Sequence, residues 1–155
     1  MQVSTPAMTL PDVLLSDERR QAVVADCVTL IDSEVARRTG VTGLAIKGVY
    51  KMVKRLDGGR MVPKAVNDLL PEFAEAFEPF HADFRSSSSP SFAAFTAGRE
   101  GELAEALLAI TDEKAKHAKN KVMKKGYNKL RPTGKGQLED AMPGVVKVVD
   151  QHAPK

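Results

Sequence analysis

The 155-residue sequence contains no tryptophan, two tyrosines, six phenylalanines and a single cysteine, Cys27. A single cysteine excludes an intramolecular disulfide and fits a reducing compartment, so we expect a cytoplasmic protein. No run approaches the roughly 18 consecutive apolar residues that a transmembrane helix needs. The segment 1–9 also lacks the charged and apolar regions of a secretory signal peptide.

Sustained alternation of apolar and polar residues, which is typical of half-buried strands, is absent as well. Apolar residues recur instead at helical spacing between turn-forming residues, so the predicted fold class is all-α. The chain is long enough for one domain with a substantial core. We expect a flexible tail over 1–10 and one compact helical bundle of about six to eight helices over 11–152.

Capping and breaking residues predict where the helices begin and end. Thr9 is expected to cap a short turn and Ser16 a long helix that begins at the next residue. Asp57 and the two glycines after it predict a break. In the helix expected over 42–56, the inward residues are Ala45, Val49, Met52, Val53 and Leu56, and the outward ones are Lys47, Lys51, Lys54 and Arg55.

Four of the six phenylalanines, here called the Phe stripe, are Phe73, Phe77, Phe80 and Phe84. Their spacing places them on one face of a helix, where Pro71 and Pro79 predict kinks or restarts. Burial of each ring would contribute roughly 1.5–3 kcal/mol to stability, which makes the stripe a candidate core. The alternative is that the Phe stripe lines a pocket for a small apolar ligand or lipid.

Basic residues gather in the last third of the chain. Residues 112–155 hold 11 basic and 5 acidic side chains, for a net charge of +6, whereas residues 1–111 hold 12 and 15, for −3. A lysine-rich helix is predicted over 114–131, with a break at 132–134. Its broad cationic face could bind nucleic-acid phosphates or an acidic protein, or could simply be solvated.

The candidate polyanion-binding residues are Lys121, Lys124, Lys125, Tyr127, Lys129 and Arg131, with Tyr127 free to stack on a base. An anionic membrane surface is a weaker alternative, because tryptophan is absent and the apolar side of this helix is narrow.

Signals for catalysis are scarce. No glycine-rich loop follows a strand, and Cys27 lies on an apolar helix face without a paired base, so a buried structural thiol is expected. The three histidines, His81, His117 and His152, are scattered and expected on the surface. An enzyme site assembled from Asp26, Glu34, Glu105 and Glu113 ranks last among the hypotheses.

One fragment has the spacing of a metal site. Glu78 and His81 match the Glu-x-x-His motif of two-metal helical bundles, but such sites need a second motif and further inward glutamates. We therefore predict no metal and no cofactor.

The two halves of the chain match each other weakly. Residues 11–84 align with 90–152 at offsets of 79, then 77, then 72, with a Ser-rich loop over 85–90 as the joint. The matched pairs include Arg20/Arg99, Tyr50/Tyr127, Lys54/Arg131, Pro71/Pro143 and Glu78/Asp150. This pattern predicts two helical halves related by a pseudo-twofold axis.

Several segments carry a family resemblance: 14–20 with 23–26, 69–73 with 78–80, 106–112, and 127–132. Through them the chain resembles an uncharacterised family of small, all-helical bacterial proteins classed as a domain of unknown function, over roughly 10–150. The resemblance implies a stand-alone helical domain and carries over no activity, cofactor or catalytic residue.

The leading hypothesis is a non-enzymatic cytoplasmic binding or scaffolding protein that contacts nucleic acid or an acidic partner through its lysine-rich helix. The alternative is a carrier of a small apolar ligand or lipid that uses the Phe stripe. The sequence does not indicate an oligomeric state.

Overall fold

The computed structural model describes residues 8–154, and within them the chain forms seven α-helices, one short 3-10 helix and no strand. The elements are α1 (Leu10–Leu14), α2 (Arg20–Arg37), α3 (Gly40–Lys54), η1 (Leu56–Gly59), α4 (Met61–Arg85), α5 (Phe92–Thr96), α6 (Glu100–Lys116) and α7 (Lys121–His152). The all-α class and the expected number of helices are confirmed. Residues 1–7 of the predicted tail lie outside the described residues, and Leu10, its last residue, is buried at the start of α1.

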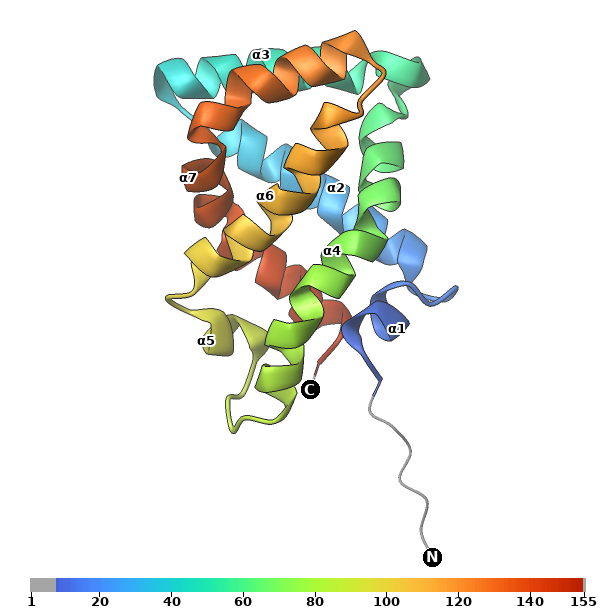
Figure 1. Ribbon diagram of the computed structural model, residues 1–155, viewed down its shortest axis with the longest axis vertical. Coiled ribbons are helices and arrows are strands. Elements are labelled where there is room, and N and C mark those ends of the chain that lie inside the picture. Colours follow the sequence, from blue (N-terminus) through green and yellow to red (C-terminus); the bar gives the residue numbers. More distant parts are fainter. Residues whose placement is uncertain (1–7, 155) are drawn as a thin grey trace, which may run out of the picture.

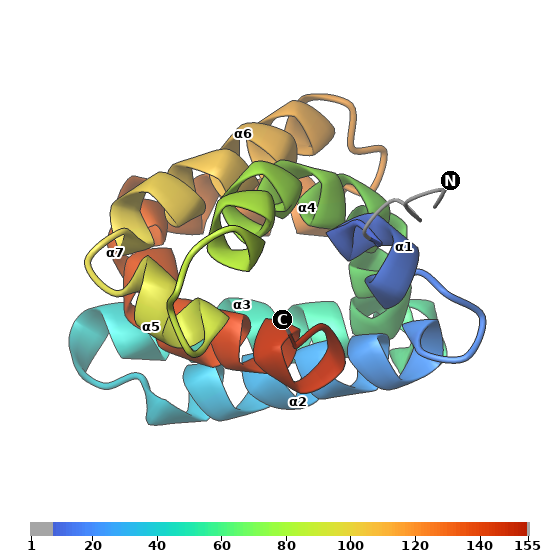
Figure 2. The same cartoon turned by 90° about the horizontal axis from the view of Figure 1, so that it is seen from below.

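The helices are arranged along one long axis (Figure 1). α3 lies across one end with the first turns of α7 beside it, while α1, α5 and the C-terminus lie at the other end. Viewed along this axis, α4 and α6 lie on one side of the molecule and α2 on the other (Figure 2). None of the helices within residues 8–154 is long and apolar enough to cross a bilayer.

The N-terminal cap was predicted correctly at α1 and incorrectly at α2. Thr9 accepts a hydrogen bond from the Asp12 backbone N–H, and the Asp12 carboxylate accepts one from the Thr9 N–H, which completes a capping box. Ser16 does not cap α2. Its hydroxyl donates to the Val13 carbonyl at 3.1 Å and so satisfies the turn before it, and α2 begins only at Arg20.

The predicted lysine-rich helix over 114–131 is wrong in both of its boundaries. α6 ends at Lys116, and Asn120 caps a new helix by accepting hydrogen bonds from the N–H groups of Val122 and Met123. α7 then continues through Pro132, where a break was predicted. A proline removes one hydrogen bond and bends a helix, and packing of α7 against α6 and α2 keeps it continuous. α4 likewise runs without a restart through Pro71 and Pro79.

Residues with positive φ flank α3 on both sides. Gly40 at its first position has φ 72°, and η1 contains Asp57, Gly58 and Gly59 with φ of 52°, 62° and 87°. Glycine adopts this left-handed region without the steric penalty that a side chain imposes. The predicted break after the second long helix is confirmed, and it turns the chain sharply from α3 into α4.

An aromatic cluster fills the end of the molecule opposite α3. The rings of Phe84 and Phe92 are fully buried with centroids 5.7 Å apart, and Phe95 and His81 lie 6.0 and 5.3 Å from Phe84. Edge-to-face and tilted pairs at these distances are the favourable aromatic geometries. This cluster is a solid part of the core.

The expectation of surface histidines is correct for His117 and wrong for His81 and His152. His81 is 2% exposed, and its Nε2 donates to the Ala153 carbonyl at 3.0 Å. The Arg85 guanidinium donates to its Nδ1. His152 is 9% exposed and its Nε2 lies 2.6 Å from the Asp26 carboxylate, which ties the end of α7 to α2.

His81 should make folding sensitive to mild acid. Burial, with the nearby Arg85 charge, lowers the pKa of His81 below its ordinary value of about 6.5. The imidazole of His81 therefore binds a proton more readily in the unfolded chain than in the folded chain. The stability that neutral His81 contributes is fully present above pH 6.5 and declines as the pH falls below this value. We expect the free energy of unfolding to fall by up to about 1.4 kcal/mol per pH unit in this range.

The measurement is a series of urea melts between pH 7.5 and pH 5 on wild type and on His81→Phe, which keeps an aromatic ring in the cluster. The variant should be less stable at pH 7.5, because the Ala153 carbonyl loses its donor, and its stability should depend less on pH. Parallel pH profiles for the two proteins would contradict this assignment.

Candidate functional site

A cavity of about 470 Å³ lies between the helices. Its walls come from both halves of the chain, and the contributing side chains from α2 and α3 include Val23, Leu30, Ile31, Ile46, Val49 and Val53. Those from α4, α6 and α7 include Val66, Leu69, Phe73, Phe77, Leu107, Met123, Leu130, Leu138, Val145 and Val149. Every α-helix except the short α5 contributes to the wall.

The lining of this cavity is almost wholly apolar. Among residues 8–154, no charged side chain lines it, and the only polar side-chain groups there are the hydroxyls of Tyr50 and Thr111 and the thiol of Cys27. The Tyr50 hydroxyl donates to Asp32 at 2.5 Å, and the Thr111 hydroxyl donates to the Leu108 carbonyl at 3.2 Å. The hydroxyls are thus already satisfied, and the wall offers dispersion contacts to an occupant.

Acid–base and nucleophilic chemistry is not favoured at this wall. Burial, together with the adjacent Asp26 charge, raises the pKa of the Cys27 thiol to about 11, so the thiolate that would act as a nucleophile is disfavoured. Burial and the hydrogen bond to Asp32 also raise the pKa of Tyr50, which stays protonated and donates.

The Phe stripe is divided between this cavity and the core. Phe73 and Phe77 line the cavity, whereas Phe84 belongs to the aromatic cluster. The Phe80 ring is half-buried, with its edge against Phe77 and the Arg99 guanidinium 5.3 Å above its centre. Phe77 also packs in the core, with its ring centroid 6.3 Å from that of Phe92.

The size of the cavity matters for stability. Apolar side chains that face a void lose the dispersion contacts that close packing would give them. An apolar occupant would restore the missing dispersion contacts.

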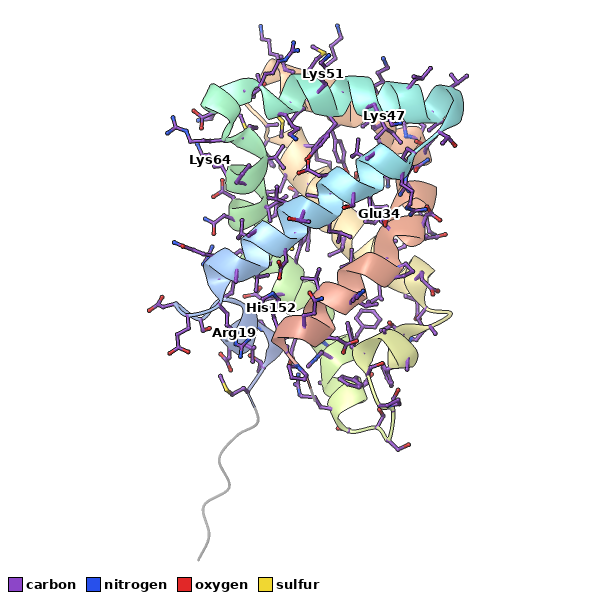
Figure 3. The ribbon with its side chains drawn as sticks, turned by 180° about the vertical axis from the view of Figure 1, so that it is seen from behind. Arg19, Glu34, Lys47, Lys51, Lys64 and His152 are labelled. Atoms are coloured by element: carbon purple, nitrogen blue, oxygen red, sulfur yellow. The ribbon has the colours of Figure 1, made fainter. Side chains whose placement is uncertain are left out.

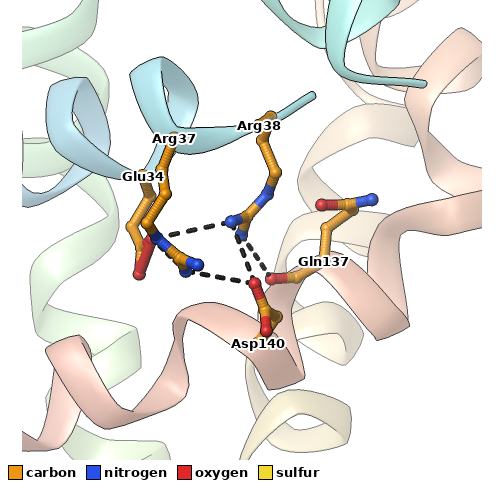
Figure 4. A network of polar contacts seen from close by, with 5 residues as sticks. All are labelled: Glu34, Arg37, Arg38, Gln137 and Asp140. Atoms are coloured by element: carbon orange, nitrogen blue, oxygen red, sulfur yellow. Dashed lines mark hydrogen bonds and ion pairs between the residues drawn. The ribbon is translucent and has the colours of Figure 1, made fainter. Parts of the chain in front are cut away.

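A second, smaller hollow of about 300 Å³ adjoins the cavity and shares Val35, Ile46, Leu130 and Leu138 with it. Beside it, Arg37 and Arg38 at the end of α2 bind Asp140 of α7 at 3.1 and 3.0 Å (Figure 4). Arg38 also donates to the Gln137 carbonyl, and Glu34 pairs with Arg37. The charges in this network balance, so it closes the gap between α2 and α7 without a free cation.

The predicted polyanion-binding residues occupy two different environments. Lys121, Lys124, Lys125 and Lys129 are exposed on the first turns of α7. Tyr127 is half-buried, and its hydroxyl bonds to Asp112 and Thr111, so the ring is not free to stack on a base. Arg131 is paired with the same Asp112 carboxylate at 2.7 Å.

The carboxylates of the enzyme hypothesis are dispersed. Asp26 contacts His152, Glu34 pairs with Arg37, Glu105 with Lys135, and Glu113 with Lys116. They belong to separate pairs, so they form no common site.

The metal-like fragment has a structural role in the described residues. Glu78 accepts from the Leu10 N–H at 2.9 Å and from both terminal nitrogens of Arg85, and both ring nitrogens of His81 are engaged as described above. Across residues 8–154, no cluster of three or more His, Cys, Asp or Glu side chains has the arrangement to hold a metal ion.

Comparison with known proteins adds one match. A family model described as "Family of unknown function (DUF6918)" matches residues 10–153, close to the extent expected from the resemblance. No curated protein and no solved structure matches the chain.

Proposed function

Because the chain belongs to a family of unknown function (DUF6918), the evidence for its role is its own geometry, from which we propose that it carries a small apolar ligand. The ligand class is a single hydrocarbon chain or a neutral molecule of similar size. The observation that carries this proposal is the 470 Å³ cavity with no charged side chain in its wall. Its volume lies within the roughly 300–1,000 Å³ of small-molecule sites.

This proposal differs from the polyanion hypothesis that ranked first from sequence. Two of the six residues in that hypothesis, Tyr127 and Arg131, are bound to Asp112. The apolar wall of the cavity, by contrast, suits an occupant of one definite chemistry. An ionised head group would find no free partner among the lining side chains, so neutral ligands should bind at least as well as charged ones.

We further infer that the carrier arose from two copies of one helical unit that enclose the cavity. Tyr50 and Lys54 both bond to Asp32, and Tyr127 and Arg131 both bond to Asp112. Tyr50/Tyr127 and Lys54/Arg131 are two of the residue pairs that match when the two halves of the sequence are aligned.

A second recurring contact supports this inference. Glu78 accepts from the first backbone N–H of α1, and its matched residue Asp150 accepts from the first two of α5. The offset between matched residues falls from 77 to 72 in the interval that contains η1, so the first half has five extra residues there. These extra residues explain why α3 and α4 together correspond to the single helix α7.

Filling the cavity should abolish ligand binding without unfolding the protein. Ala74 lies on the wall with 2% exposure, so Ala74→Phe places a ring where the ligand would sit. We expect at least a tenfold loss of affinity for a fluorescent long-chain fatty alcohol, about 1.4 kcal/mol, measured by fluorescence titration. Ala65→Phe, at another wall position, serves as the second variant, and the exposed Ala109→Phe on α6 is the matched control.

Native mass spectrometry of the purified wild type provides an independent reading, because a co-purified apolar compound should appear as a mass increment absent from Ala74→Phe. If the wild type carries no such compound and binds neither fatty alcohols nor fatty acids, the carrier proposal is wrong.

A further inference from the structure

The outer face of α3 exposes large apolar side chains. Val41 is 87% exposed, Leu44 72% and Met52 57%, and among residues 8–154 the only other large apolar side chain classed as exposed is Met8. Met52 was expected to face inward. It lies six residues after the buried Ile46, roughly 120° around the helix at about 100° per residue, and so falls outside the inward arc.

Exposed lysines lie on the same helix as this apolar patch and on the neighbouring helix. Lys47 and Lys51 lie on α3 (Figure 3), and Lys121, Lys124, Lys125 and Lys129 are exposed on the adjoining turns of α7. Within the described part of the chain, none of these six has a carboxylate within 4.0 Å. Neither α3 nor residues 121–138 contain an acidic residue. We call the three apolar residues and these six lysines the α3 face.

The two helices that carry the α3 face are packed closely. A side-chain carbon placed on Gly126 of α7 would lie only 2.7 Å from the Val49 side chain of α3, so glycine permits this approach. α3 and the first turns of α7, which carry these residues, therefore lie together at one end of the molecule (Figure 1).

We propose that the α3 face docks on an anionic lipid surface. Apolar side chains on a basic helix enter the boundary between head groups and acyl chains, while the lysines meet the lipid phosphates. The lysine-rich segment alone has too narrow an apolar side for membrane binding, and the exposed apolar side chains of α3 supply the missing apolar surface. Nucleic acid would gain nothing from exposed Val41 and Leu44, and the nearby Tyr127 is bound to Asp112 rather than free to stack.

The location of the cavity favours the same partner. Ile46, Val49 and Val53, on the opposite face of α3, line the cavity, so a single helix separates the docked surface from the ligand site. This link rests on the proposed carrier function, whereas docking itself depends only on the exposed residues.

The test is flotation of the full-length protein with vesicles of equal parts phosphatidylglycerol and phosphatidylcholine, compared with pure phosphatidylcholine. One basic residue near an anionic membrane contributes roughly a fivefold gain in binding, so Lys47→Gln with Lys51→Gln should weaken it about 25-fold. Arg19→Gln with Lys147→Gln removes the same charge elsewhere and should change it less than about twofold.

The apolar part is tested separately. Leu44→Ser with Val41→Ser should weaken vesicle binding at least tenfold. Met8→Ser removes a similarly exposed apolar side chain outside the α3 face and should leave vesicle binding unchanged. Both sets of α3 variants change only exposed side chains, so their folding can be verified by unchanged thermal melts.

Three outcomes overturn docking. They are equal binding to neutral and anionic vesicles, equal binding by Lys47→Gln/Lys51→Gln and its control, and tighter binding to duplex RNA or DNA that is the same for wild type and Leu44→Ser/Val41→Ser. The two proposals fail separately. If the wild type floats with anionic vesicles but binds no apolar ligand, docking holds and the carrier function fails. If the wild type binds fatty alcohol but no vesicles, the reverse applies.

Discussion

Phe84→Ala is expected to lower the free energy of unfolding by about 3–5 kcal/mol, the range for truncation of a buried aromatic ring. Phe84 is fully buried, and its ring packs against Phe92, Phe95 and His81 with centroids 5.3 to 6.0 Å apart. Truncation would remove transfer free energy and leave a void that the surrounding rings cannot close. The loss would be a large part of the total of roughly 5–15 kcal/mol.

The informative control is Phe73→Ala, in the same stripe. Phe73 is half-buried and faces the cavity, so its ring has fewer packing partners. Phe73→Ala should therefore lower the free energy of unfolding by less than about 2 kcal/mol. Denaturant melts of both variants at pH 7.5 give the comparison. Equal losses at the two positions would mean that the division of the Phe stripe between core and cavity is incorrect.

Arg85→Met should lower the free energy of unfolding by about 2–3 kcal/mol, the second largest loss expected. Arg85 donates to both oxygens of Glu78 at 2.9 and 2.8 Å, and without it a carboxylate only 21% exposed would keep the Leu10 N–H as its remaining hydrogen-bond donor. Loss of one partner from a fully buried pair costs about 3–5 kcal/mol, and partial exposure of this pair lowers the figure. Lys116→Met breaks the exposed pair with Glu113 and should change the free energy of unfolding very little.

The pH dependence identifies the cause. The hydrogen bond from Arg85 lowers the pKa of Glu78, so the stability that this pair contributes is present above pH 4.5 and is lost as the pH falls through the lowered value. The difference between wild type and Arg85→Met should therefore shrink in acid. A difference that stays constant from pH 7 to pH 3 would assign the effect to packing instead of charge. A double-mutant cycle with Glu78→Gln should give a coupling energy of at least about 1 kcal/mol.

Features that depend on neighbouring residues could be predicted from the sequence. Helical periodicity predicts the fold class, Thr9 as a cap predicts the start of α1, and the glycines after Asp57 predict the turn before α4. The start of α7 was also encoded locally, because Asn120 is a strong N-cap residue three positions before the apolar Met123. A proline is a less decisive signal, because tertiary packing can hold a bent helix together through it.

Features that depend on distant residues could not be predicted. The burial of His81 requires the Ala153 carbonyl, 72 positions away, as a partner for its ring nitrogen. The polar capacity of Tyr127 is taken up by Asp112 on another helix. The cavity has no local signature either, since Phe73 and Phe84 obey the same periodicity and only the packing of the whole chain separates them.

The positive-φ residues at both ends of α3 divide the protein into regions of unequal local stability. Only Gly43 and Ile46 are buried among the 15 residues of α3, whereas α4 buries six side chains. Local opening of a segment requires free energy in proportion to the contacts it gives up, so α3 should detach from the bundle more often than the whole chain unfolds. Gly40 and residues 57–59 can absorb the backbone rotation while α2 and α4 stay in place. We therefore expect faster amide hydrogen exchange in α3 than in the aromatic cluster, and a passage between the cavity and its surroundings would form at the α3 end.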